Sequence, residues 1–177
     1  MRNWRKLLLI GIAILLTSCR ATTIEVAVPF EVKETIIKEK LKDGAIIMYT
    51  TTQDNEGKEF DALSIAYLEG DEKKGWRNEG SNHWEYKEMS PLMVYYQDIY
   101  DYSKKGEILS RFQLTYGQVE SAEIVSVEGS ETGNQYSNLK LIEKEGKRYF
   151  FEMKKYPYIR ALDKEKNIIA EEKPRRS

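Results

Sequence analysis

The sequence predicts a single mainly β or α+β domain, built from about seven to nine short antiparallel strands with one helix near its N-terminal end. Short runs of β-branched and aromatic residues alternate along the chain with turns rich in Gly, Asp and Asn. The length of 177 residues is that of about one average domain. The chain contains 12 Tyr, 5 Phe and 3 Trp, which can build a core, so intrinsic disorder is excluded.

The first segment has the composition of a secretory signal peptide. Arg2, Arg5 and Lys6 give it a positive end, and the run 7–16 (LLLIGIAILL) carries no charge. Such a run rises only about 15 Å as a helix, against a hydrocarbon core of about 30 Å, so a permanent membrane span is disfavoured. A buried core helix would not explain the one-sided charge. We therefore expect residues 1–18 to be a leader that is cleaved from the mature protein.

The end of this segment, Leu16-Thr17-Ser18-Cys19, consists of an aliphatic residue and two small residues before the only Cys of the chain. It resembles the lipobox of bacterial lipoproteins. In that family a diacylglycerol, carrying acyl chains such as palmitate, is attached to the Cys, and a peptidase cuts before it, here between Ser18 and Cys19. The resemblance implies a protein anchored in the lipid bilayer through Cys19, on the extracytoplasmic face of the cell membrane. Two acyl chains give stable anchoring, whereas one gives only marginal binding.

Charge and cysteine content limit the partners of the chain. With 28 basic and 29 acidic residues the net charge is −1, so no excess positive charge is present to bind nucleic acid. One Cys cannot form a disulfide within the chain, and its alternative role is that of a small buried side chain. Cleavage of the leader removes three basic residues and leaves a mildly acidic domain, which is not drawn to anionic lipid.

These arguments divide the chain into four parts. Residues 1–18 are the leader, and residues 19–29 are expected to form a lipidated tether, which reaches at most about 30 Å when extended. Residues 30–170 form the domain, which we expect to stand off the bilayer on its tether. Residues 171–177 (EEKPRRS) should fray.

The domain begins with an ambiguous segment and continues as β-structure. In residues 30–42 apolar side chains recur at helical spacing with Glu and Lys between them, which favours a helix. Residues 45–52 (AIIMYTTT) and 60–68 (FDALSIAYL) are predicted strands, and the turn signal at residues 54–57 (DNEG) joins them into a hairpin.

The remaining segments are shorter. Residues 69–90 are expected to form a polar loop, and residues 91–102 a strand or a short helix. Further predicted strands occupy residues 108–116, 122–127, 139–143, 147–153, 159–162 and 167–170.

Four stretches between Gly44 and Ala170 carry a second resemblance. They are DGAIIMYTT, the pair Gly75-Trp76, FQLTYGQVESAEIV, and GKRYFFE followed by ALDKEKNII. In these features the segment is similar to a group of uncharacterised exported proteins and lipoproteins of spore-forming Gram-positive bacteria. The resemblance implies an exported location and no particular activity.

No motif predicts a metal site, a cofactor or a catalytic serine. His83 is the only His and lies in the polar loop, where general-base or metal chemistry would need partners that the sequence does not supply. The turn at residues 54–57 resembles the start of a Ca²⁺ loop, but Ile65 stands where the twelfth, acidic position would fall. The chain has no phosphate loop, dinucleotide fingerprint or G-x-S-x-G elbow.

Two functional hypotheses remain. Asp98 and Asp101 flank Tyr100, and a pair of carboxylates beside aromatic rings is what a glycan-active cell-envelope hydrolase would need. The other hypothesis is a non-catalytic module that binds a protein or cell-wall component through aromatic side chains, which are enriched at interfaces. The candidate binding residues are Trp76, Trp84, Tyr86, Tyr95, Tyr96 and Tyr100. Their alternative role is to complete or cap the core. We predict the binding module, with the hydrolase as the alternative.

Overall fold

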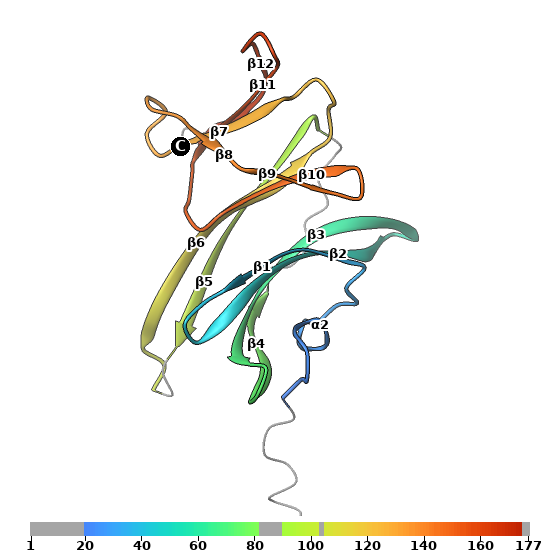
Figure 1. Cartoon of the computed structure of the whole chain (residues 1–177), viewed down its shortest axis with the longest axis vertical. Helices are drawn as coiled ribbons and strands as arrows, with labels where there is room; N and C mark the ends of the chain where they lie inside the picture. Colours follow the sequence, from blue (N-terminus) through green and yellow to red (C-terminus); the bar gives the residue numbers. More distant parts are fainter. Residues whose placement is uncertain (1–19, 82–89, 103–104, 175–177) are drawn as a thin grey trace, which may run out of the picture.

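Three antiparallel sheets of four strands each make up the fold in the computed structural model, which describes residues 20–81, 90–102 and 105–174 (Figure 1). The side chains of residues 101–102 and 109–111 lie outside this description. The predicted fold class, a small and mainly β antiparallel domain, is confirmed. The described part of the chain contains twelve strands, more than predicted, because strands also form in the segments 30–42 and 69–90 and because residues 137–144 form two strands instead of one.

The first sheet, sheet A, is a meander of four consecutive strands. In spatial order they are β1 (Glu34–Lys40), β2 (Gly44–Asn55), β3 (Lys58–Asp71) and β4 (Gly75–Ser81). The predicted hairpin is confirmed: Asp54 Oδ1 accepts a hydrogen bond of 3.0 Å from Gly57 N, and Glu56 and Gly57 have φ of 54° and 81°. A Gly at such a position supplies the left-handed backbone without steric cost.

The other two sheets combine strands from distant parts of the chain. Sheet B has the order β5 (Leu92–Tyr102), β6 (Ile108–Val119), β10 (Lys147–Glu152) and β9 (Leu141–Lys144). Sheet C has the order β12 (Ile168–Glu172), β11 (Tyr158–Leu162), β7 (Ser126–Ser130) and β8 (Ser137–Leu139). Residues 91–102, for which the sequence left two possibilities, therefore form a strand.

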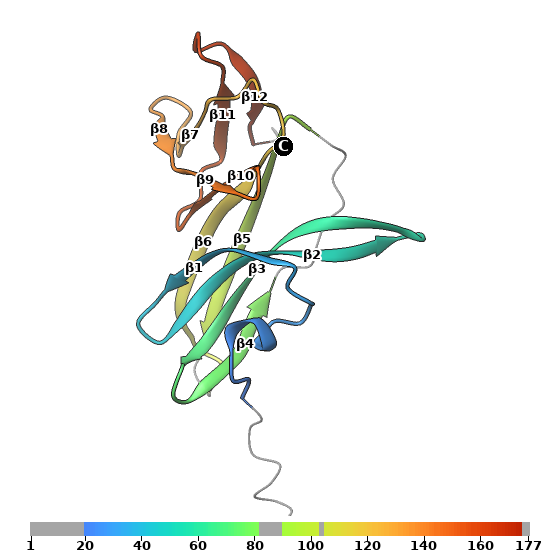
Figure 2. The ribbon, with the colours of Figure 1, turned by 45° about the vertical axis from the view of Figure 1, so that its right-hand side comes forward.

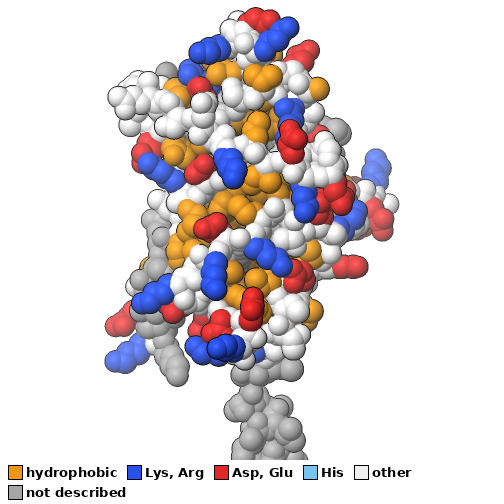
Figure 3. Space-filling model, viewed as in Figure 1, with side chains coloured by type: hydrophobic (Ala, Val, Ile, Leu, Met, Phe, Trp, Pro, Cys, Tyr) orange, Lys and Arg blue, Asp and Glu red, His pale blue; other side chains and the backbone are white. Residues whose placement is uncertain are grey.

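Sheet B is the middle of three layers. Along β10, Tyr149 and Phe151 pack in a core shared with sheet A, whereas Phe150 packs in a second core shared with sheet C. Successive side chains of a strand point to opposite faces, so one strand serves both cores. Figures 1 and 2 show sheets A and C at opposite ends of the molecule with the strands of sheet B between them. In Figure 3 hydrophobic side chains are visible along the face in view, from the level of sheet A to that of sheet C.

Sheet A is also covered on both faces. Ile46 and Met48 of β2 point to sheet B, and Ile47 and Tyr49 point to a third core, on the outer face. Burial on both faces explains the uninterrupted apolar run AIIMY at the start of β2. The N-terminal segment covers the outer face, with Val28 buried there and Ile24 and Phe30 packed beside it.

The expected helix over residues 30–42 is wrong, because residues 34–40 of this segment form β1. The register with β2 shifts between Thr35 and Ile37, which makes Ile36 the extra residue of a β-bulge. The bulge resets the alternation, so that Ile36 and Ile37 both contact the core between sheets A and B. Because Ile36 and Ile37 both point inward and Leu41 follows Ile37 by four residues, the apolar residues show the spacing that is typical of a helix.

A short helix lies earlier in the chain than predicted. α2 (Ile24–Ala27) begins after Thr23, whose hydroxyl accepts a hydrogen bond of 3.4 Å from Val26 N. It falls inside residues 19–29, which the sequence assigned to a lipidated tether. Among the described residues no helix is long and apolar enough to cross a membrane. At the other end, β12 includes Glu171 and Glu172, the first two residues of the expected frayed tail, which pair with Arg160 and Ile159.

Candidate functional site

The chain joins sheet A as soon as the described part begins. Ala21 N donates to Trp76 O at 2.9 Å, and Trp76 N donates to Ala21 O at 2.8 Å, which makes an antiparallel bridge on the free edge of β4. Arg20 Nη1 donates to Gly75 O at 3.4 Å. Residues 20–28 are therefore packed on the domain in this structure.

Two glycines make this close contact possible. Gly75 has a φ of +78°, and a Cβ on it would lie 2.9 Å from both Ala21 O and Arg20 Cβ. Gly70, with a φ of +130°, would place a Cβ 2.1 Å from Gly75 O. Larger residues at either position would displace the N-terminal segment or the β3–β4 turn. The pair Gly75-Trp76, which the sequence analysis identified only by resemblance, is thus the place where the N-terminus attaches.

A pocket of about 710 Å³ lies beside this attachment point. Its walls are Arg20 and Ile24, the end of β1 with the β1–β2 turn, and the β3–β4 turn, with Trp76 among the lining residues. Figures 1 and 2 show α2 and β4 near the end of the molecule at which the described chain begins, far from sheet C. The pocket therefore lies at the N-terminal end of the molecule.

Two of the four acidic side chains of the pocket already have partners. Glu69 binds Arg77 at 2.6 Å and Arg20 at 3.8 Å. Asp71 Oδ1 accepts hydrogen bonds of 2.8 Å from the backbone N of both Lys74 and Lys73, and these bonds hold the pKa of Asp71 below its ordinary value. These two carboxylates fix the β3–β4 turn and contribute little free negative charge.

Three lysines of the pocket lack such partners. Lys38 pairs with Glu25, and Lys74 lies 3.5 Å from Asp71. Lys40, Lys42 and Lys73 line the pocket and are exposed, and none of them forms an ion pair with a residue that the structure describes. Asp43 and Glu72 are the remaining acids of the lining. With six basic and four acidic residues, the pocket is positive in a chain whose net charge is −1.

This arrangement suits an anionic ligand better than acid–base chemistry. A general acid of a glycosidase needs a carboxyl group whose pKa is raised, whereas the pKa of Asp71 is lowered. Among the described carboxyl groups burial raises the pKa of Glu152, which lies on β10 and outside the pocket. No group of three or more described His, Cys, Asp or Glu residues could hold a metal ion.

The four members of the predicted aromatic set that the structure describes do not form one exposed patch. Trp76 is only 7% exposed and packs in the third core. Tyr95 stacks on Tyr116, with ring centroids 5.4 Å apart, in the core between sheets A and B. Tyr96 packs on the opposite face of β5, in the core with sheet C, and burial raises its pKa to about 12. Tyr100 is half-buried on the same strand.

Several other predicted residues lie outside the described part of the chain. They are Ser18, Cys19, His83, Trp84 and Tyr86. Asp98 is described and accepts a hydrogen bond of 3.0 Å from Gln113 Nε2, but the side chain of Asp101 is not.

The pocket lysines were missed by sequence reasoning. Lys40 and Lys42 border one turn and Lys73 lies in another, more than thirty residues later, and only the pairing of β2 with β3 brings the two turns to one end of sheet A. The Asp-Gly pair at residues 43–44 and the Lys-Lys-Gly run at residues 73–75 are ordinary turn signals.

The chain matches no protein-family model, no curated protein and no solved structure.

Proposed function

We propose that this protein is a surface lipoprotein, anchored in the membrane through a diacylglyceryl group on Cys19, whose domain is a non-catalytic module that binds a protein or cell-envelope component. The observation that carries the anchor is the sequence Leu16-Thr17-Ser18-Cys19 at the end of an uncharged run. The fold agrees with it, because cleavage before Cys19 would keep every residue from Arg20 onward that packs on sheet A.

The electrostatics of the pocket support a binding role. A hydrolase of the paired-carboxylate class needs two carboxyl groups with opposite protonation states, set about 5 to 10 Å apart. In the pocket, Glu69 is paired with Arg77, and Asp71 accepts hydrogen bonds from backbone amides, which lower its pKa. Free positive charge and a preformed hollow are instead features of a site that holds an anion.

The anchor is tested by replacing Cys19 with Ser in cells that make the whole chain. We expect the unaltered protein in the membrane fraction, with an intact mass that corresponds to residues 19–177 plus acyl chains. Cys19→Ser should abolish processing at this site and the acyl mass. Thr22→Ser, an exposed conservative change three residues further on, is the matched control and should behave as the unaltered protein. An unprocessed chain from Met1 in the membrane for all three forms would refute the lipid anchor.

The binding role is tested with photo-crosslinking side chains in living cells. One set replaces Trp84 and Tyr86, the predicted binding residues outside the described part, and the matched position is Lys58, exposed at the tip of the β2–β3 hairpin. A binding module should give a defined adduct from the first set and none from Lys58. Identical adduct patterns at all three positions would contradict a binding surface at these aromatic residues.

A further inference from the structure

The packing of residues 20–28 leaves little room between the domain and an anchor at Cys19. Arg20 contacts Gly75 and Glu69, and Ala21 pairs with Trp76. One residue spans at most about 3.6 Å, so the pocket beside Arg20 would lie at the level of the lipid headgroups. This step rests on the proposed function, because it takes Cys19 to be the anchored residue.

We propose that the pocket is a docking site for the phosphate-bearing headgroups of anionic phospholipid in the same membrane. Lys40, Lys42 and Lys73 provide the charge, since they are exposed and form no ion pair within the described residues. The domain then lies against the bilayer instead of standing off it, although its net charge is negative. The distribution of charge decides this orientation: the positive pocket faces the anchored end, where its field acts within a Debye length of about 8 Å.

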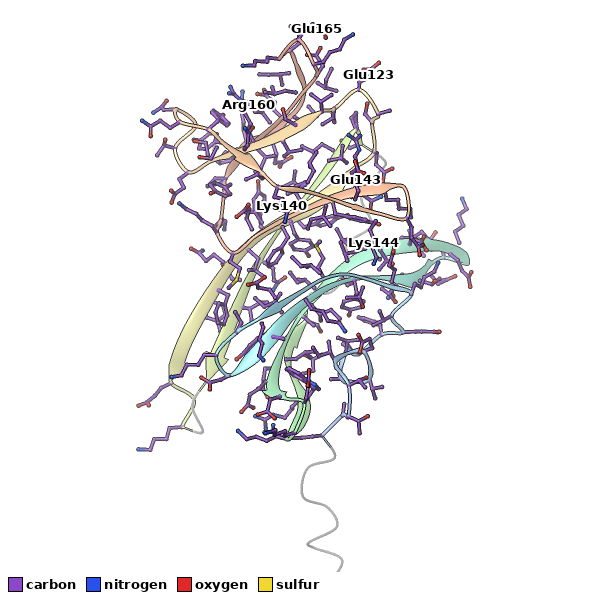
Figure 4. The ribbon with its side chains drawn as sticks, viewed as in Figure 1. Glu123, Lys140, Glu143, Lys144, Arg160 and Glu165 are labelled. Carbon is purple, nitrogen blue, oxygen red and sulfur yellow. The ribbon has the colours of Figure 1, made fainter. Side chains whose placement is uncertain are left out.

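The number of lysines that the pocket holds near the bilayer sets how strongly the domain docks. Each Lys or Arg held close to an anionic leaflet strengthens its association about fivefold. Removing the charges of Lys42 and Lys73 should therefore shift the docking equilibrium about 25-fold towards the undocked domain. The β11–β12 turn lies at the opposite end of the molecule, where Figure 4 labels Glu165. Its lysines, Lys164 and Lys166, are exposed and provide a control that makes the same change in net charge.

The test uses the lipidated protein purified from membranes and reconstituted into nanodiscs, either of phosphatidylcholine alone or with about one third phosphatidylglycerol. The readout is the rate at which a water-soluble reagent acetylates Lys40, relative to Lys164, measured by mass spectrometry. We expect Lys40 to react at least fivefold more slowly in the anionic discs. The double variant Lys42→Gln, Lys73→Gln should lose this protection of Lys40. The control double variant Lys164→Gln, Lys166→Gln should keep it. In the control the acetylation of Lys40 is measured relative to Lys173, because Lys164 has been replaced.

Each outcome decides between docking and its alternatives. Equal acetylation of Lys40 in both discs overturns the docking site while leaving the anchor intact. In a second outcome, glycerol phosphate protects Lys40 in phosphatidylcholine discs and phosphatidylglycerol has no added effect. This result assigns the pocket to a soluble phosphate compound and also overturns the docking of lipid headgroups. The intact mass, read before reconstitution, reports on the anchor separately: a protein without acyl chains refutes the proposed function and this inference together.

Discussion

Gly75→Ala is the substitution that most directly tests how the N-terminus is held. A Cβ at position 75 would lie 2.9 Å from Ala21 O and from Arg20 Cβ, so the N-terminal segment must move. Gly57 is a matched control, because its φ of +81° is close to the +78° of Gly75 and a Cβ there would meet nothing within 4 Å. The two variants share the backbone strain and differ in the contact with residues 20–21.

The expected losses in free energy of unfolding follow from that difference in contacts. A non-glycine residue in the left-handed region costs about 1–2 kcal/mol, which applies to both variants. Gly75→Ala also removes the two hydrogen bonds between Ala21 and Trp76, at about 0.5–1.5 kcal/mol each. We therefore expect the free energy of unfolding to fall by about 1–2 kcal/mol in Gly57→Ala and by about 2–5 kcal/mol in Gly75→Ala.

Urea unfolding followed by circular dichroism measures the two free energies. Hydrogen exchange of the Trp76 amide, which donates to Ala21 O, measures the attachment itself. This amide should exchange at least tenfold faster in Gly75→Ala and at an unchanged rate in Gly57→Ala. Equal losses of stability in the two variants, together with unchanged exchange at Trp76, would show that Gly75 is needed only for its left-handed backbone conformation and not for the contact with residues 20–21.

Three further predictions concern the cores and the titrating groups. Phe150→Ala empties a fully buried site between sheets B and C and should lower the free energy of unfolding in urea by about 3–5 kcal/mol. Met153→Ala, at a residue that is 40% exposed, should lower it far less. Comparable losses in the two variants would contradict the two-core assignment. Lys33 lies 2.6 Å from Asp61 and lowers the pKa of Asp61 below 3.8, so this ion pair stabilises the fold above pH 3.8 and the stabilisation is lost on acidification below that pH. Lys33→Met should raise the pKa of Asp61 in an NMR titration. An unchanged pKa would contradict the ion pair. Burial raises the pKa of Tyr149 from 10 to about 12, so its contribution to stability is complete below pH 10 and declines as the pH rises towards 12. Its hydroxyl has no hydrogen-bond partner among the described residues, so Tyr149→Phe should remove one late-titrating tyrosine from the ultraviolet absorbance titration without loss of stability, and a loss above about 1 kcal/mol would refute this.

The hairpins were predictable because their signals are local. The turn at residues 54–57 lies between two runs of β-branched and aromatic residues, and the structure pairs Asn55 with Lys58 across it. β1 was not predictable in this way, because the bulge at Ile36 disrupts the period of two that identifies a strand. Its identity as a strand depends on β2, to which it pairs along its whole length.

The separation of Tyr95 from Tyr96 was predictable from the sequence. Tyr95 and Tyr96 are consecutive, so a strand over residues 91–102 must place them on opposite faces, and the structure does so. Counting aromatic residues without assigning their faces grouped side chains that belong to separate cores. The basic pocket, in contrast, depends on which strands are neighbours, and no local pattern reports that.

Phe150 and Phe151 are adjacent in the chain, yet each completes a different core. Unfolding of β10 would therefore expose both cores at once, and neither sheet A nor sheet C could keep its packing against sheet B. β10 pairs with β6 across a segment that contains β7, β8 and β9, so this pairing is a long-range contact. The three small sheets are in this way coupled into one cooperative unit through a single six-residue strand.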